Sequence, residues 1–181
     1  MRLLSMFLGL SIIGSLAVAG CGSDSDSGTQ NTAGTAGAAA TQCAGIYAEF
    51  SASAFATGTT SGKGCAADEA EICGTDVTTI VGTVGASCYQ NPDHSDGAQD
   101  ACVQAGIADQ LKTLSAACTN CYVADVACAR DKCLADCGLS PGSVKCAQCR
   151  AENGCASSFY DCSGLPVPTG TDLGGAGASG E

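Results

Sequence analysis

The sequence predicts an all-α fold, a small domain of helical hairpins joined by disulfide bonds, and three observations lead to this prediction. The chain of 181 residues contains 15 cysteines, a density typical of exported proteins that disulfides hold together. Apolar residues recur at helical spacing along several segments. The last eight cysteines, from Cys121 to Cys162, are arranged symmetrically about a short turn.

Three apolar stripes predict the helices of the first part of the domain. The first stripe contains Cys43, Tyr47, Phe50 and Ala54. The second contains Val77, Ile80, Val81, Val84 and Cys88, and its spacing favours a helix despite its β-branched residues. The third contains Ile107, Leu111, Leu114 and Cys118. Asp96, with Gln99 three residues later, predicts a capping box at the start of this third helix.

The second and third stripes flank segment 89–101, which is rich in turn residues. A helical hairpin centred on this segment brings Cys88 opposite Cys102, and Cys73 opposite Cys118. We therefore predict the disulfides Cys88–Cys102 and Cys73–Cys118. Cys43 and Cys65 then remain to pair with each other.

A second hairpin is predicted around the turn 138–143. Facing residues of antiparallel helices lie at equal distances from the turn, and four nested cysteine pairs satisfy this condition. We call these four pairs the disulfide ladder; they are Cys137–Cys146, Cys133–Cys149, Cys128–Cys155 and Cys121–Cys162. Gly138 is expected just after the first helix, and Ser140 and Pro141 are expected to begin the second.

The ladder requires a break in the helices. At 100° per residue, Cys133 and Cys137 lie roughly 140° around a straight helix from Cys121 and Cys128. A break at Asn153-Gly154 accommodates this change on the second helix; without such breaks at least two of the four pairs would be wrong.

The nested pairing resembles that of the α-hairpinins, whose helices each carry C-x3-C. Cys133 and Cys137 match that spacing, but Cys146 and Cys149 are one residue closer, and no function is transferred.

Composition divides the chain into four parts. Residues 1–20 read as a signal peptide, residues 21–42 as a flexible lipidated linker, residues 43–162 as the cysteine-rich helical domain, and residues 163–181, rich in Gly and Pro, as a disordered tail. The apolar run 3–16 is too short for a transmembrane helix, which needs about 20 apolar residues.

The segment Val18-Ala19-Gly20-Cys21 resembles the bacterial lipobox. The resemblance implies transfer of diacylglycerol to the Cys21 thiol, cleavage before this residue and acylation of the new amino group. Gly22, where enteric lipoproteins of the inner membrane carry Asp, favours the outer membrane. More loosely, the chain resembles cysteine-rich lipoproteins of Gram-negative bacteria such as the myxobacteria. If Cys21 carries lipid, 14 of the 15 cysteines remain, an even number that can pair completely.

The charge excludes several partners. The formal charge is −11, and removing the signal peptide with Arg2 leaves 6 Lys and Arg against 18 Asp and Glu, or −12. Such a surface repels nucleic acids and anionic headgroups. The expected partners are therefore the membrane, through the lipid on Cys21, and a protein or a glycan.

The sequence offers few candidate residues for catalysis or metal binding. The single histidine, His94, lies in a turn without a recognisable catalytic partner. Asp93, Ser95, Asp96 and Asp100 offer oxygen ligands for calcium, but their spacing does not match an EF-hand. We expect no cofactor and no enzymatic activity.

The expected function is a structural, adhesive or binding role at the cell envelope. The alternative is a thiol-redox or metal-binding protein that uses the two C-x-x-C pairs, Cys118/Cys121 and Cys146/Cys149.

Overall fold

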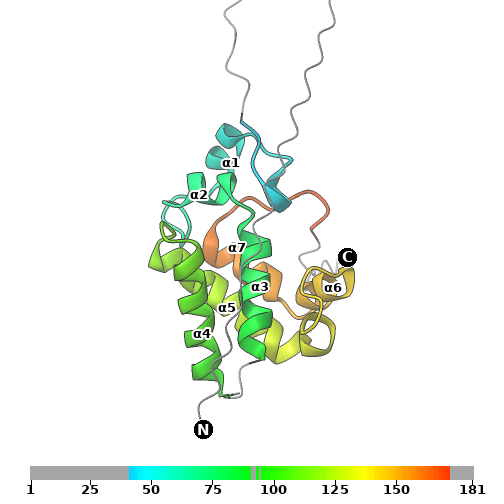
Figure 1. Ribbon diagram of the computed structural model, residues 1–181. Coiled ribbons are helices and arrows are strands. Elements are labelled where there is room, and N and C mark those ends of the chain that lie inside the picture. Colours follow the sequence, from blue (N-terminus) through cyan, green and yellow to red (C-terminus); the bar gives the residue numbers. More distant parts are fainter. Residues whose placement is uncertain (1–40, 91–92, 94, 172–181) are drawn as a thin grey trace, which may run out of the picture. The chain divides into compact units, whose positions relative to one another are not determined.

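The computed structural model describes residues 41–90, 93 and 95–171, and in these residues the fold is all-α, as predicted (Figure 1). The elements are η1 (Gly45–Tyr47), α1 (Ala52–Gly58), α2 (Glu69–Gly74), α3 (Val77–Tyr89), α4 (Asp96–Gln110), α5 (Ala116–Cys137), α6 (Val144–Glu152) and α7 (Cys155–Ser163). The signal peptide, Cys21 and linker residues 22–40 lie outside the described residues.

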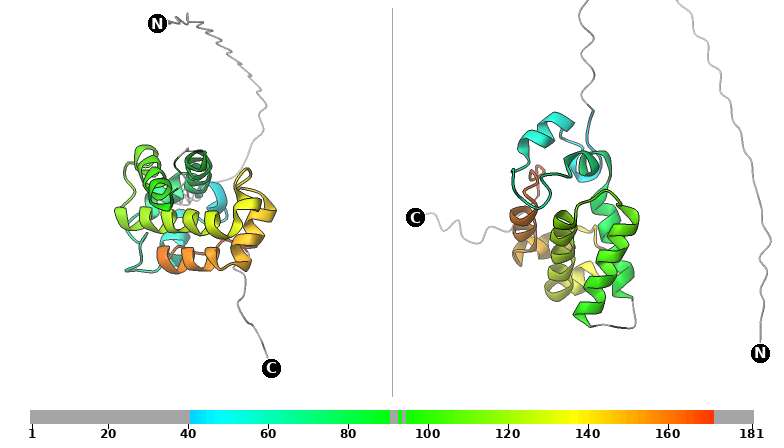
Figure 2. Two further views of the ribbon diagram at one scale, coloured as in Figure 1. Left: turned by 90° about the horizontal axis from the view of Figure 1, so that it is seen from below. Right: turned by 90° about the vertical axis from the view of Figure 1, so that its left-hand side faces the viewer.

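Helix α5 is the central element of the domain. It packs against α3 and α4 on one side and against α6 and α7 on the other (Figure 2). The main core lies between these helices and the short elements η1, α1 and α2, and its fully buried side chains include Phe55, Ile72, Ile107 and Leu111. Aromatic rings also contribute to this core, and the centroids of Tyr47 and Phe55 lie 4.8 Å apart in an edge-to-face contact.

Helices α3 and α4 form the predicted first hairpin, closed by Cys88–Cys102. Val77, Val81 and Val84 are buried, as the helical stripe predicted. The expected capping box is wrong by one residue, because Ser95 is the N-cap of α4 and Asp96 is its first helical residue. The Ser95 N–H and hydroxyl both donate to Asp93 Oδ1, at 3.0 and 2.8 Å.

The third apolar stripe does not form one continuous helix. Helix α4 ends at Gln110, and α5 begins at Ala116 with Ser115 as its N-cap, whose hydroxyl accepts from the Cys118 N–H at 3.2 Å. Leu111 is nevertheless buried between the two helices. Cys118 therefore starts a new helix that runs in a different direction from α4.

This break explains why two predicted disulfides are wrong. The predictions Cys43–Cys65 and Cys73–Cys118 are replaced by Cys43–Cys73 and Cys65–Cys118. Pairing by distance from a turn requires helices that are continuous or interrupted at matching positions. Here α2–α3 is interrupted at residues 75–76 and α4–α5 at the longer stretch 111–115, so the positions no longer match.

Residues 43–54 also differ from the predicted helix. Gly45 adopts a left-handed conformation with φ 58°, and η1 is followed by a return of the chain that pairs Gln42 with Ser51 in a β-bridge. The Ala44 N–H donates to the Cys73 carbonyl at 2.7 Å. This contact places Cys43 beside Cys73 rather than beside Cys65.

All four disulfides of the ladder form as predicted. The required breaks are present on both helices. Cys133 has a non-helical conformation within α5 (φ −128°, ψ 20°), and the predicted break at Asn153-Gly154 separates α6 from α7, with Gly154 left-handed at φ 73°.

The turn between α5 and α6 differs in detail from the prediction. Gly138 keeps a right-handed helical conformation (φ −58°), so α5 ends without a left-handed glycine. Ser143, and not Ser140, is the N-cap of α6, because its hydroxyl accepts from the Cys146 N–H at 3.2 Å. Ser140 and Pro141 belong to the preceding turn.

The domain extends beyond both predicted boundaries. The Ser163 carbonyl accepts from the Cys65 N–H at 3.0 Å, and the Gly164 carbonyl accepts from Thr60 at 2.7 Å. Leu165 is buried in the main core. Residues 163–171 are therefore part of the domain and not of a disordered tail, whereas residues 172–181 lie outside the described residues. Thr41 also joins the domain, because its carbonyl accepts from Ala52 at 2.8 Å.

Candidate functional site

The cysteines of both C-x-x-C pairs are bonded to partners outside their own pair. Cys118 joins Cys65 and Cys121 joins Cys162, while Cys146 joins Cys137 and Cys149 joins Cys133. A C-x-x-C redox centre cycles through a disulfide between its own two cysteines. In the oxidised domain neither pair has this arrangement or offers a thiolate to a metal. Within the described ranges, no three His, Cys, Asp or Glu side chains are grouped to hold a metal ion.

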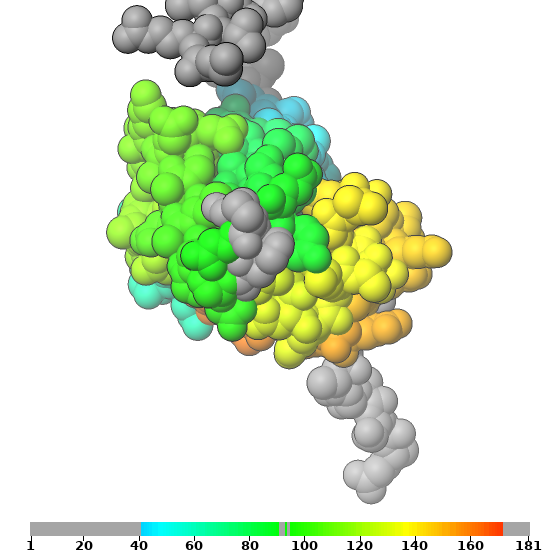
Figure 3. Space-filling model, turned by 60° about the horizontal axis from the view of Figure 1, so that its bottom comes forward, coloured from blue at the N-terminus to red at the C-terminus, as the bar shows by residue number. Residues whose placement is uncertain are grey.

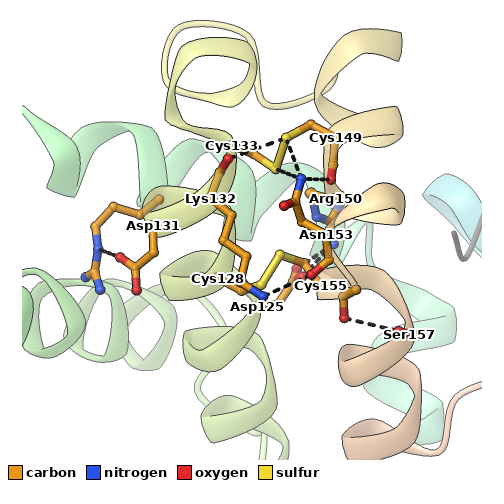
Figure 4. The surroundings of a disulfide bond; sticks show 12 residues. Asp125, Cys128, Asp131, Lys132, Cys133, Cys149, Arg150, Asn153, Cys155 and Ser157 are labelled. Carbon is orange, nitrogen blue, oxygen red and sulfur yellow. Dashed lines mark hydrogen bonds and ion pairs between the residues drawn. A yellow bond between two sulfur atoms is a disulfide. The ribbon is translucent and has the colours of Figure 1, made fainter. Parts of the chain in front are cut away.

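The Cys133–Cys149 disulfide has a polar environment, supplied by the C-cap of α6 (Figure 4). The Asn153 side-chain N–H group donates to the Cys149 carbonyl at 2.9 Å, which fixes the orientation of the amide. The same nitrogen lies 3.4 Å from Cys149 Sγ and 3.8 Å from Cys133 Sγ. Lys132 Nζ donates to the Asn153 carbonyl at 3.0 Å. The Asn153 amide thus lies beside the Cys133–Cys149 disulfide, whereas the Lys132 ammonium lies toward Cys128 and Cys155 (Figure 4).

A part-buried ion pair connects α5 and α6 close to the ladder. Arg150 Nη2 lies 2.6 and 2.8 Å from the two carboxylate oxygens of Asp125. Burial raises the pKa of Asp125 above its usual value, and the charge of Arg150 offsets part of this shift. Arg150 Nε is buried without an acceptor in the part of the chain that the structure describes.

Three tyrosines lie near this pair. The hydroxyls of Tyr47 and Tyr122 are buried, and neither makes a well-formed hydrogen bond to another described residue. Burial raises the pKa of Tyr47, Tyr122 and Tyr160 above that of an exposed tyrosine, and the mutual proximity of these phenols contributes to the shift of the first two.

A shallow cleft of about 310 Å³ lies where the ends of α3 and α4 meet α5. Figure 3 shows this face of the molecule, with the green surface of α3 and α4 beside the yellow surface of the α5–α6 region. Its lining residues are Tyr89, Asp96, Gln99, Arg130, Asp131 and Leu134. Arg130 organises the cleft: its guanidinium lies 2.7 Å from Asp131 and 2.8 Å from Asp100, and more loosely, 3.6 Å, from Asp96. We call this recess the Arg130 cleft. It combines an aromatic ring, an exposed leucine and fixed charges, as contact surfaces for partners do.

The residues considered for calcium binding are engaged otherwise. Asp96 and Asp100 contact Arg130, and Asp93 accepts from Ser95. His94 lies outside the described residues.

Several of these functional candidates carried little signal in the sequence. Arg130, Arg150 and Asn153 belong to no motif. The scarcity of arginine was the available signal. The chain contains three arginines, Arg2, Arg130 and Arg150, and the two that the structure describes both contact carboxylates.

No family model, curated protein or solved structure matches this chain. None of the helices in the described ranges is long and apolar enough to cross a membrane. Seven disulfides are typical of a domain outside the cytoplasm, where thiols are not kept reduced. Cys21, the candidate lipid site, lies outside the described residues.

Proposed function

We propose that this chain is a lipid-anchored protein of the bacterial cell envelope whose helical domain is a rigid, non-enzymatic binding module. The observation that carries the proposal is the cysteine pairing. Seven disulfides use 14 of the 15 cysteines, and the one left over is Cys21. This residue follows an apolar segment in the lipobox-like sequence Val18-Ala19-Gly20-Cys21.

The charge of the chain supports a lipid as the means of attachment. A mature protein with 18 acidic and 6 basic residues is repelled by anionic headgroups. A single acyl chain gives only marginal membrane binding, whereas the two or more chains of a lipoprotein give stable anchoring. Gly22 in place of Asp favours the outer membrane as the destination.

The disulfide framework supports a role in exposed surroundings. Every helix from α2 to α7 carries at least one cysteine bonded to another segment. Cross-links of this kind limit the local openings through which proteases attack. A rigid body also binds a partner with little loss of conformational entropy, and the Arg130 cleft is where we expect the partner, a protein or a glycan, to make contact.

The anchoring test uses the full chain expressed in a Gram-negative host. Cys21→Ser should abolish incorporation of labelled fatty acid, leave the precursor uncut and move the protein out of the detergent phase. Ser23→Ala is the matched control and should behave like the parent chain. Normal membrane attachment of the Cys21→Ser variant would refute the proposal.

A thiol count separates this proposal from the alternative of a thiol or metal protein. The native, unreduced domain should show no free thiol and no stoichiometric metal. Two or more free thiols at Cys118, Cys121, Cys146 or Cys149, or one bound metal ion per chain, would favour the alternative.

A further inference from the structure

The end of the α5–α6 hairpin is held differently from the rest of the domain. The main core contains the apolar side chains, whereas a separate small cluster at the hairpin end consists of Cys133, Cys137 and Cys146, with Ala129 and Cys149 packed against it. The large apolar residues of this region point outward, since Leu139 is 93% exposed and Val144 is 73% exposed. Disulfides therefore supply most of the cohesion that apolar packing supplies elsewhere.

The two sulfurs of the Cys133–Cys149 bond differ in accessibility. Cys133 is 1% exposed and faces the small cluster. Cys149 is half-buried, so it is the more accessible of the two cysteines. Cys133 also has the non-helical conformation that interrupts α5.

Asn153 is placed to assist cleavage of this bond. Its side-chain nitrogen reaches both sulfurs, at 3.4 Å for Cys149 and 3.8 Å for Cys133 (Figure 4). A hydrogen-bond donor stabilises the negative charge that develops on a departing sulfur. The Lys132 ammonium donates to the Asn153 backbone carbonyl at 3.0 Å and helps to hold Asn153 in this position.

We propose that Cys133–Cys149 is a site of reversible thiol–disulfide exchange, at which a low-molecular-weight thiol forms a mixed disulfide with Cys149. The thiolate attacks Cys149 Sγ and a new sulfur–sulfur bond forms there. The Cys133–Cys149 bond breaks, and its electron pair leaves on Cys133 Sγ, which then takes a proton from water. Attack of the Cys133 thiolate on the mixed disulfide reverses the reaction and releases the small thiol.

This chemistry is distinct from that of a C-x-x-C dithiol, because the two sulfurs come from different helices. It is also independent of the lipid on Cys21. Its effect is local, since the remaining ladder disulfides Cys137–Cys146, Cys128–Cys155 and Cys121–Cys162 stay closed.

The test uses the full oxidised chain and a limiting amount of glutathione as the probe, at mildly alkaline pH. The reaction is stopped with acid, free thiols are alkylated, and unreduced peptides are mapped by mass spectrometry. The first product should carry glutathione on Cys149 and the alkyl group on Cys133. Opening of any other disulfide first, or a first adduct on Cys133, would overturn the proposal.

Variants of Asn153 test the assisting contact. Asn153→Ala should lower the initial rate of adduct formation at Cys149 about three- to tenfold, the effect of losing one ordinary hydrogen bond to a sulfur that carries only part of a charge. Asn153→Asp should lower it further, because a carboxylate repels the developing thiolate. Asn120→Ala, at an exposed position of α5, is the matched control and should leave the rate unchanged. A faster reaction in both Asn153 variants would show that Asn153 only holds the helix end closed, and would overturn its assigned role.

Discussion

The carboxylate of Asp68 accepts two hydrogen bonds from Ser115, one from its N–H at 2.7 Å and one from its hydroxyl at 2.6 Å. Asp68 precedes α2, and Ser115 is the N-cap of α5, so these bonds connect two segments 47 residues apart. The Cys65–Cys118 disulfide joins the same two segments three residues from each partner. The contacts of Asp68 with Ser115 and the disulfide Cys65–Cys118 together fix the first residue of α5 and the direction of the helix axis.

Removing the Asp68 carboxylate should therefore destabilise the domain. Asp68→Ala leaves the part-buried N–H and hydroxyl of Ser115 without their acceptor, at a cost of about 1–2 kcal/mol in the free energy of unfolding. Urea unfolding of the oxidised protein measures this cost. Asp109→Ala, at an exposed position of α4, is the charge-matched control and should change stability by less than about 0.5 kcal/mol.

The part-buried pair Asp125–Arg150 predicts that one single variant is less stable than the double variant. Arg150→Met should cost about 1–3 kcal/mol, because it leaves the largely buried Asp125 carboxylate without its partner. The double variant Asp125→Asn/Arg150→Met should recover part of this loss, since no buried charge remains. Thermal unfolding of the three proteins checks the order, and a double variant less stable than Arg150→Met would contradict it.

The tyrosines predict a loss of stability at alkaline pH. Burial raises the pKa of Tyr47, Tyr122 and Tyr160 above the ordinary value of 10.0, so the folded domain retains their protons more strongly than the unfolded chain does. Their contribution to stability is therefore complete below pH 10 and is lost progressively as the pH rises further. In a Tyr89→Phe background, tyrosinate absorbance and loss of helical ellipticity should appear together. Ionisation of these phenols in a fully helical domain would contradict the prediction.

The disulfide pattern can be checked directly. Mass spectrometry of unreduced peptides should find Cys43 with Cys73 and Cys65 with Cys118, and detection of Cys43 with Cys65 would refute this pairing. The two cysteines of Cys65–Cys118 lie 53 residues apart, and those of Cys137–Cys146 lie 9 apart. In the loop-entropy model, replacing both cysteines by Ala should cost about 4 kcal/mol for the first bond and about 2.5 kcal/mol for the second.

The Arg130 cleft predicts where a partner binds. A photo-crosslinking amino acid at Leu134, which lines the cleft, should yield one defined crosslinked product in native envelopes. The same group at Asp109, an exposed position outside the cleft, should yield none. Equal crosslinking at the two positions would show that the cleft is not the contact surface.

The sequence predicted correctly those helices and disulfides that depend on regular residue spacing around a turn. The helical stripe from Val77 to Cys88 and the four ladder disulfides follow from spacing alone, and even the need for a break at Asn153-Gly154 could be deduced from helix geometry. These features depend on uninterrupted or symmetrically interrupted helices, which spacing describes well.

The remaining features depend on where helices stop and on contacts between distant segments. The pairing of Cys65 with Cys118 follows from the end of α4 at Gln110, which no glycine or proline marks. Arg130 and Arg150 meet carboxylates 30 and 25 residues away, on the other side of a helix–helix contact. Such contacts have no local pattern and emerge only when the chain is folded.

The two breaks in the hairpin have a mechanical consequence. Helix α7 is bonded to α5 through Cys121–Cys162 and Cys128–Cys155, and α6 is bonded to the end of α5 through Cys133–Cys149 and Cys137–Cys146, beyond the change of direction at Cys133. If all disulfides between two helices lay in one plane, the helices could still bend in the direction perpendicular to that plane. Here the two disulfides to α7 and the two disulfides to α6 lie on different sides of α5, so together they restrict the bending of α5 in two directions.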